Sequence, residues 1–258
     1  MGFNYRNAPA VERARAIVSS GEIGAVETVR VGLSSDYAAH PDGALSWRFD
    51  PAYAGTGVLG DLASHGFDLV RYVAGPATGE IVELVSDQAT FIRERPVATG
   101  AVSHFQTATG APKGPVGNED QVSALLRFAS GSRGLLSSSR VAVGDQCAYG
   151  FEVRGETGAV SWDFRRMGEL QVCAGQGYQD AAWQTRYVSR TDGELAAFQP
   201  GGGVAMGYDD LKVIEAERLL ASIVSGAPEG ATIADMVLAA RLVDATLRSD
   251  AEKRWITL

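Results

Sequence analysis

Apolar residues recur at helical spacing in the stretch that follows the glycine-rich segment 55–60. One stripe consists of Leu62, Ala63, Gly66, Phe67, Val70 and Val73. This spacing predicts a helix with one side packed on a core. The other stripe carries Asp61, His65 and Asp68 at positions i, i+4 and i+7, with Tyr72 next along it. Three ionisable side chains are therefore expected on one face of the helix.

The pair of Asp61 and His65 is the strongest candidate for chemistry. Histidine titrates near neutral pH, and a carboxylate one turn away can hold its tautomer, so the two could transfer a proton. An Asp–His pair at this spacing is also common as a solvated surface pair. A divalent metal on Asp61, His65 and Asp68 is a third possibility, but metal sites usually draw ligands from several elements. Because the chain has no Cys-x-x-Cys and no His-x-x-x-His, we predict no metal site.

Shorter patterns outline the rest of the chain. Pro9 at a first helical turn and Gly21 bracket a short helix, and the alternation over 25–33 predicts a strand. Residues 34–57 are rich in glycine, proline and aspartate and predict a long ordered loop. Two closing helices are expected over 208–225 and 232–248, before a last short strand at 253–257. Further strands are expected over 80–92, 97–107, 121–129, 133–143, 147–155, 159–165, 169–174 and 183–189.

The recurring strands define the fold class. Strands joined by short turns, such as Ser130-Gly-Ser, form a mostly antiparallel sheet. Because the chain has no internal repeat or low-complexity tract, residues 1–258 are expected to form a single α+β domain with helices on one face of a large sheet. Every second residue from Val122 to Phe128 is apolar, and the residues between them are mixed. This pattern permits an interface on the second face of the sheet but does not require one.

Composition narrows the class of protein. Acidic residues outnumber basic ones by 31 to 23, and the net charge of −8 argues against nucleic-acid binding, which usually needs a basic surface. No apolar run is long enough to cross a bilayer and no signal peptide is recognisable, so no membrane association is expected. Cys147 and Cys173 have no spacing signature and are expected to be buried free thiols, as in a cytoplasmic protein.

Several short motifs follow one another in a recognisable order. They are Gly2-Phe-Asn-Tyr-Arg6-Asn-Ala-Pro9, Gly21-Glu-Ile-Gly24, Ser46-Trp-Arg-Phe-Asp50, Asp61-x-x-x-His65-x-x-Asp68, Asn118-Glu-Asp120, Phe151-Glu-Val-Arg-Gly-Glu-Thr-Gly158 and Gly207-Tyr208. The ordered set resembles the Gfo/Idh/MocA family of NAD(P)-dependent oxidoreductases, which includes glucose–fructose oxidoreductase and inositol dehydrogenase. The resemblance extends over essentially the whole chain.

The resemblance implies a fold and an activity. The fold is the dihydrodipicolinate-reductase-like C-terminal domain of the family, a large and mostly antiparallel sheet with helices on one face. The activity is oxidation of a secondary hydroxyl of a sugar, polyol or inositol with NAD or NADP. His65 matches the family's general base, and Asp61 matches the acid that orients this base or anchors a neighbouring hydroxyl. The open face of the sheet implies a homodimer or tetramer.

The resemblance also implies that the cofactor half of the enzyme is missing. The family's nucleotide-binding domain begins with a G-x-G-x-x-G turn and ends near a Glu-Lys-Pro motif with the catalytic lysine. This chain has no such turn, and Gly201-Gly-Gly203 follows a proline and polar residues. None of Lys113, Lys212 and Lys253 precedes a proline or the Asp61 helix. The N-terminal dinucleotide-binding domain and all cofactor-binding residues are therefore expected to be absent, which would leave the chain inactive by itself.

Polyol recognition needs several hydrogen-bonding side chains, because an unpaired buried hydroxyl costs about 1–3 kcal/mol. The candidates for this lining are Asn4, Tyr5, Arg6, Trp47, Arg48 and Tyr208. Each also has a structural alternative, because the aromatic residues could fill a core and the arginines could form ion pairs. His40 and His104 lie in polar surroundings and are expected to be solvated.

Two other functions stay open. Without a cofactor domain, the chain could be a non-catalytic carbohydrate-binding or assembly module, or a subunit that recruits a separate nucleotide-binding partner. An apolar surface where such a partner docks would distinguish half of an enzyme from a stand-alone module, which should be polar there. A metal-dependent hydrolase that uses Asp61, His65 and Asp68 ranks last, because no further ligand cluster is visible.

Overall fold

The computed structural model describes residues 2–98, 106–175, 177–189, 198–199 and 201–258. A nine-stranded sheet consists of β1 (Val26–Ser34), β2 (Ile81–Ala89), β5 (Gln121–Phe128), β6 (Arg133–Ser139), β7 (Ala148–Gly155), β8 (Gly158–Asp163), β9 (Glu169–Ala174), β10 (Gln184–Tyr187) and β11 (Ile256–Thr257). Its order is β10-β9-β8-β7-β1-β6-β5-β2-β11. Adjacent strands are antiparallel, except that β1 and β6 are parallel. The prediction of a large, mostly antiparallel sheet is confirmed.

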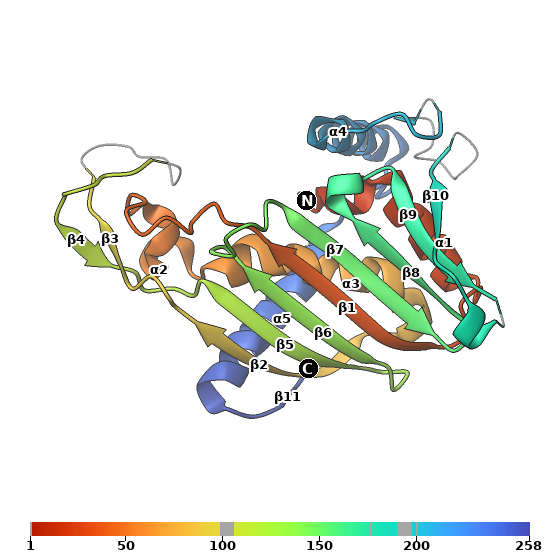
Figure 1. Cartoon of the computed structure of the whole chain (residues 1–258), viewed down its shortest axis with the longest axis horizontal. Helices are drawn as coiled ribbons and strands as arrows, with labels where there is room; N and C mark the ends of the chain where they lie inside the picture. Colours follow the sequence, from red (N-terminus) through yellow and green to blue (C-terminus); the bar gives the residue numbers. More distant parts are fainter. Residues whose placement is uncertain (1, 99–105, 176, 190–197, 200) are drawn as a thin grey trace.

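Helices cover one face of this sheet, as expected (Figure 1). The helices α1 (Pro9–Ser19), α3 (Ser64–Thr78) and α5 (Ile233–Glu252) contact the strands. Proline opens α1, and a capping box of Thr232 and Asp235 opens α5. A fourth helix, α4 (Tyr208–Ser225), lies against the short turn η1 (Asn4–Asn7). The opposite face of the sheet is free of helices in Figure 1.

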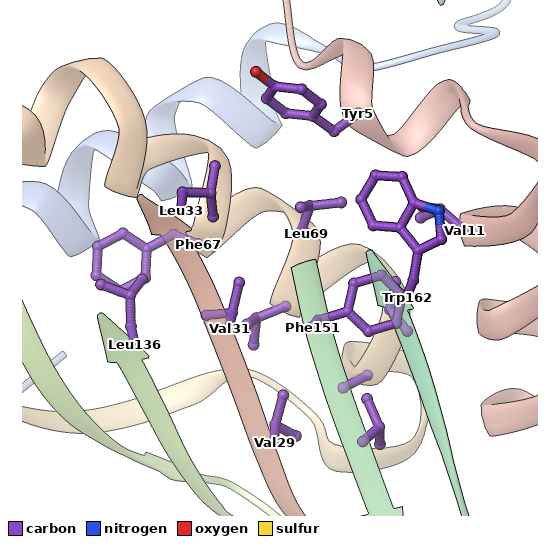
Figure 2. Close-up of a cluster of buried hydrophobic side chains, with 14 of the residues drawn as sticks. Tyr5, Val11, Val29, Val31, Leu33, Phe67, Leu69, Leu136, Phe151 and Trp162 are labelled. Carbon is purple, nitrogen blue, oxygen red and sulfur yellow. The ribbon is translucent and has the colours of Figure 1, made fainter. Parts of the chain in front are cut away.

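One core lies between the sheet and the helices (Figure 2). Val29, Val31 and Leu33 of β1 are buried, and they alternate with exposed or half-buried residues. Phe67 lies over them from α3, whose predicted apolar stripe is buried throughout. Gly66 allows this close packing, because a Cβ atom there would lie only 3.0 Å from Leu33 Cδ1. The periodic residues of the sequence therefore position α3 on the sheet.

The predicted long loop joins β1 to α3 and contains two short helical turns. These are η2 (Trp47–Phe49) and α2 (Pro51–Ala54). A small second sheet, which the sequence did not indicate, pairs β3 (Glu94–Pro96) with β4 (Lys113–Pro115). Arg95 of β3 is buried and donates hydrogen bonds to the carbonyl oxygens of Ala38 and His40. The loop is therefore tied to this sheet and has a defined conformation.

Some expectations are corrected or fall outside the described residues. The thiols do not form a disulfide, but Cys147 is exposed and Cys173 is half-buried, so the prediction of buried thiols is wrong for Cys147. His40 is exposed as expected, whereas His104 and most of the strand expected over 97–107 lie outside the described residues. Short turns occur at η4 (Phe164–Arg166) and η5 (Tyr178–Asp180). In the part of the chain that the structure describes, no helix is long and apolar enough to span a membrane.

Candidate functional site

A buried group of polar side chains lies behind the helix that carries Asp61 and His65. We call Asn118, Glu119, Asp120 and Arg140 the polar hub. Arg140 Nε donates to Asp120 Oδ1 over 2.9 Å, and Arg140 Nη2 donates to Asn118 Oδ1 over 2.8 Å. Asp120 Oδ2 accepts the backbone N–H groups of residues 91 and 92, each over 2.9 Å. Each of these buried charges is therefore paired and hydrogen-bonded, as a buried charge must be to avoid a large desolvation cost.

The polar hub binds both ends of the 48–57 segment. Asn118 Nδ2 donates to the carbonyl oxygens of Arg48, over 2.8 Å, and Thr56, over 3.2 Å. Glu119 Oε1 accepts the N–H groups of Gly57, over 2.7 Å, and Leu59, over 2.9 Å. A carboxylate at a helix N-terminus satisfies free N–H groups and interacts favourably with the helix dipole. The hub therefore fixes the loop and the start of the helix relative to each other.

The helix begins with a π turn, η3 (Leu59–Ala63), before α3 continues it. Gly57 precedes this turn, and any side chain there would collide with the Glu119 carbonyl oxygen. A π turn contains an additional residue per turn and so rotates the residues that follow it. Asp61 is partly exposed, whereas Asp68 is 2% exposed. The two carboxylates bind different partners, Arg48 for Asp61 and Arg6 for Asp68, so the three ionisable groups expected on one stripe do not form one cluster.

Two side chains hold the Asp61 carboxylate. Tyr37 donates its hydroxyl to Oδ2 over 2.5 Å, and Arg48 Nη1 donates to Oδ1 over 3.0 Å. Arg48 also lies over the ring of Trp47, with its guanidinium carbon 4.8 Å from the ring centre. The structure thus brings together the predicted residues Trp47, Arg48 and Asp61. Tyr37 was not predicted, because nothing in the loop sequence indicates that its hydroxyl reaches the helix.

His65 lies beside Asp61 among aromatic rings. Its ring centre is 5.5 Å from that of Phe3 and 5.1 Å from that of Tyr5, both in edge-to-face contact. The Nδ1 atom is buried and has no hydrogen-bond partner among the described residues. Burial lowers the pKa of His65 from 6.5 to about 4, and the charge of Asp61 opposes this decrease. His65 is therefore a neutral imidazole at pH 7, which can accept a proton.

Arg6 and Asp68 form a buried ion pair away from Asp61. Arg6 Nε donates to Asp68 Oδ2 over 3.0 Å, and Nη2 donates to the other carboxylate oxygen. The remaining nitrogen, Nη1, donates to Asp235 Oδ2 over 3.4 Å. Burial raises the pKa of Asp68 to about 6, and the Arg6 guanidinium opposes this increase. Because its three nitrogens are engaged, Arg6 fits the structural alternative better than the substrate-binding one.

Of the other predicted lining residues, Tyr5 contacts His65 directly. Asn4 is 2% exposed, and its Nδ2 atom has no hydrogen-bond partner among the described residues. Tyr5 is buried, and its ring centre lies 5.5 Å from that of Tyr149. Tyr208 is half exposed at the start of α4 and reaches this cluster through Phe164. Burial raises the pKa of Tyr5, and the nearby Tyr149, which was not predicted from the sequence, raises it further.

A cavity of about 240 Å³ opens beside Asp61. We call it the inner cavity; it is lined by Tyr37, Trp47, Arg48, Ala54, Thr56, Gly57, Gly60, Asp61 and Arg140. Its volume is below the roughly 300–1,000 Å³ of most ligand pockets, so it suits a small molecule. Its lining combines an aromatic wall with charged donors and one carboxylate. This combination suits a molecule with several hydroxyl groups, which both donate and accept hydrogen bonds.

The described residues do not fit a metal or a dinucleotide. They contain no group of three His, Cys, Asp or Glu side chains that could hold a metal ion. The turn at 201–203 precedes α4, and among the described residues the preceding strand, β10, ends at Tyr187. A dinucleotide site of the usual kind needs a glycine-rich turn between a strand and a helix.

The protonation of His65 provides a direct check on this geometry. The chain has three histidines, so imidazole NMR signals can be followed individually during a pH titration. We expect a pKa of about 4 for His65. The Asp61→Asn variant should give a still lower value, because the charge that favours imidazolium is removed. A His65 pKa at or above 6.5, or one that Asp61→Asn leaves unchanged, would contradict the arrangement; the exposed His40 supplies the control signal.

Comparison with known proteins agrees with the motif order. A model of the GFO/IDH/MocA C-terminal domain matches residues 11–161. The chain is 33% identical over 259 residues to levoglucosan dehydrogenase of Pseudarthrobacter phenanthrenivorans, covering 99% of this chain and 65% of that protein. It is 28% identical over 262 residues to inositol 2-dehydrogenase of Rhizobium meliloti, covering 100% of this chain and 64% of that protein. The chain thus spans about two thirds of the length of these relatives.

Solved structures show the same similarity. The apo form of levoglucosan dehydrogenase superposes with a TM-score of 0.91 at 32% identity, covering 100% of this chain and 65% of that chain. The complex of levoglucosan dehydrogenase with NADH and L-sorbose gives a TM-score of 0.88 at 32% identity, covering 99% of this chain and 64% of that chain. The match to the family model, the sequence identity and the shared fold together show that this chain belongs to the Gfo/Idh/MocA family and corresponds to its C-terminal domain.

Proposed function

We propose that this chain is the substrate-binding and catalytic-base half of an NAD(P)-dependent oxidoreductase. Its substrate would be a sugar, polyol or inositol, and the reaction would oxidise a secondary hydroxyl group of that molecule. The observation that carries the proposal is the Asp61 carboxylate, held by Tyr37 and Arg48, beside the neutral imidazole of His65. The names of the relatives, levoglucosan and inositol dehydrogenases, support the same substrate class.

Oxidation of a secondary alcohol removes a hydride from carbon and a proton from oxygen. The nicotinamide cofactor would accept the hydride and would be held outside this chain, since the described residues offer no dinucleotide site. The chain would supply the proton acceptor. Its other contribution would be to orient the hydroxyl groups of the substrate, because a general base acts only within hydrogen-bonding distance of the proton that it removes.

His65 would take the hydroxyl proton. Its Nδ1 atom is buried and has no partner among the described residues, so we assign the proton transfer to the other ring nitrogen, Nε2. Burial keeps the imidazole neutral before the reaction. The negative charge of Asp61 then stabilises the imidazolium that forms, because a nearby opposite charge favours the protonated state. Asp61 therefore assists the base electrostatically.

The same carboxylate would anchor the substrate. A carboxylate has about four acceptor positions, and Tyr37 and Arg48 use one position on each oxygen of Asp61. The remaining positions are available to substrate hydroxyls in the inner cavity. Asn4, Tyr5, Tyr149 and Tyr208 would supply further polar contacts on the His65 side. Arg6 is not included, because Asp68 and Asp235 engage its guanidinium.

The exposed surface of α4 supports the interpretation that the chain is half of an enzyme rather than a stand-alone carbohydrate-binding module. Only Leu211 and Ile214 of this helix are buried. Five apolar side chains on α4 are exposed by 58% to 88%: Val213, Leu219, Leu220, Ile223 and Val224. Exposed apolar patches of this kind mark interaction sites, because leaving them in water is unfavourable. A nucleotide-binding domain docked on α4 would cover this patch, whereas a stand-alone module should be polar there.

The role of His65 can be tested in an enzyme that combines this chain with a nucleotide-binding half. We expect His65→Ala to lower kcat about 100-fold or more, because general-base catalysis contributes at least this much. Circular dichroism should show an unchanged fold. His40→Ala is the matched control, since His40 is exposed, and it should keep full activity. Full activity of His65→Ala would rule out the assignment.

The open face of the sheet supports a dimer or tetramer. Leu125 of β5 pairs with Leu135 of β6, and both side chains are exposed, by 51% and 40%. Their neighbours Leu126 and Leu136 are buried in the core, so Leu125 and Leu135 point to the opposite face. No helix covers that face in Figure 1. Burying such residues against a second subunit would stabilise an oligomer, since apolar burial contributes about 25 cal/mol per Å².

Light scattering at micromolar concentration tests this assembly. The chain should have the mass of a dimer or tetramer, and Leu125→Asp should shift it to the monomer because a charge would be buried at the interface. Val143→Asp changes an exposed residue of the loop before β7 and should leave the mass unchanged. A monomeric wild-type chain, or an unaffected Leu125→Asp variant, would contradict the proposed interface.

A further inference from the structure

A second cavity, which we call the outer cavity, adjoins the inner one. Its volume is about 480 Å³, and its lining includes Ser46, Trp47, Asp50, Pro51, Tyr53 and Pro115. Trp47 belongs to the lining of both cavities. On the inner side, Arg48 lies over the Trp47 ring and binds Asp61. A ring packed against Trp47 in the outer cavity would therefore lie next to a molecule bound at Asp61.

The aromatic residues of the outer cavity are unusually exposed. Trp47 is 57% exposed and Tyr53 is 79% exposed. Large aromatic side chains stabilise a structure or a complex most when they are buried. Exposed aromatic side chains therefore often mark a surface on which another molecule packs. Pro51 and Pro115 also line this cavity and add rigid apolar surface. A flat ring with apolar C–H groups, such as a sugar, is the kind of molecule that such a surface accommodates.

Polar groups that line the outer cavity can form hydrogen bonds with hydroxyl groups of a ligand. Ser46 is 7% exposed, and its hydroxyl has no hydrogen-bond partner among the described residues. An unpaired buried hydroxyl costs about 1–3 kcal/mol, which a ligand hydroxyl could recover after a side-chain rotation. Asp50 Oδ1 accepts the N–H of Ala52, and the described residues include no salt bridge to this carboxylate. Its second oxygen can accept from a sugar hydroxyl.

We propose that the outer cavity is a second sugar subsite, which binds the neighbouring ring of a disaccharide or glycoside while the first ring lies at Asp61. The inference rests on the proposed function, because it takes the inner cavity as the site of the first ring. The small volume of the inner cavity, about 240 Å³, leaves a second ring no room there. The shared wall at Trp47 places that ring in the outer cavity instead. The natural substrate would accordingly be a glycosylated sugar or polyol.

Calorimetric titration of this chain with matched ligand pairs tests the subsite. The probes are D-glucose against cellobiose and maltose, and myo-inositol against galactosyl-inositol. At least one two-ring ligand should bind fivefold or more tightly than its one-ring partner. Tyr53→Ala and Ser46→Ala should abolish this gain and leave the one-ring affinity unchanged. Tyr187→Ala is the matched control, because Tyr187 is an exposed tyrosine that lines neither cavity, and it should keep the gain.

The outcomes separate the two proposals. If no two-ring ligand binds more tightly, or if the gain persists in Tyr53→Ala, the subsite is overturned. A fall in molecular mass on Tyr53→Ala in light scattering would show that the surface binds a second copy of the chain, which also overturns it. Asp61→Asn addresses the proposed function instead: one-ring affinity that is insensitive to this variant would remove the inner site, whatever Tyr53 does.

Discussion

The site depends on the pairing of buried charges in the polar hub. Asp120 is fully buried and Arg140 is 1% exposed, so neither charge can be satisfied by water. Breaking such a pair costs roughly 3–5 kcal/mol, because one charge is left unpaired in the interior. The chain must therefore adopt the one arrangement in which Asn118, Glu119 and Asp120 reach their partners. That arrangement brings the 48–57 segment against the start of the Asp61 helix.

This arrangement places two neighbouring groups, Asp61 and His65, in different environments. Asp61 is partly exposed and is held by two donors, Tyr37 and Arg48. His65, four residues later, is enclosed by the rings of Phe3 and Tyr5 and is kept neutral by burial. A neutral imidazole beside a hydrogen-bonded carboxyl group is a suitable starting state for proton removal from a hydroxyl. Asp68, in contrast, is paired with Arg6 and stabilises the fold.

Much of the fold could be predicted from periodic patterns. The alternation in β1 and β5 predicted the sheet. The apolar stripe of α3 predicted that a helix covers one face of it and carries Asp61 and His65. The hub could not be predicted, because the burial of Asn118 and Glu119 depends on partners 62 to 70 residues away in the chain. The same holds for Tyr37 and for the pairing of Arg6 with Asp68. The exposure of the Cys147 thiol could not be predicted either, because the spacing of the two cysteines does not indicate whether a thiol lies in an exposed loop.

The most direct test measures whether the hub determines sugar binding at Asp61. Calorimetry should compare one-ring polyol affinity in the wild-type chain and in the Glu119→Ala and Glu119→Gln variants, each shown to be folded by circular dichroism. Glu119→Ala removes the acceptor of the Gly57 and Leu59 N–H groups and should weaken binding at least fivefold. Glu119→Gln keeps a carbonyl oxygen as acceptor and should restore most of the affinity. A folded Glu119→Ala variant with wild-type affinity would show that Asp61 and Arg48 are positioned independently of the hub.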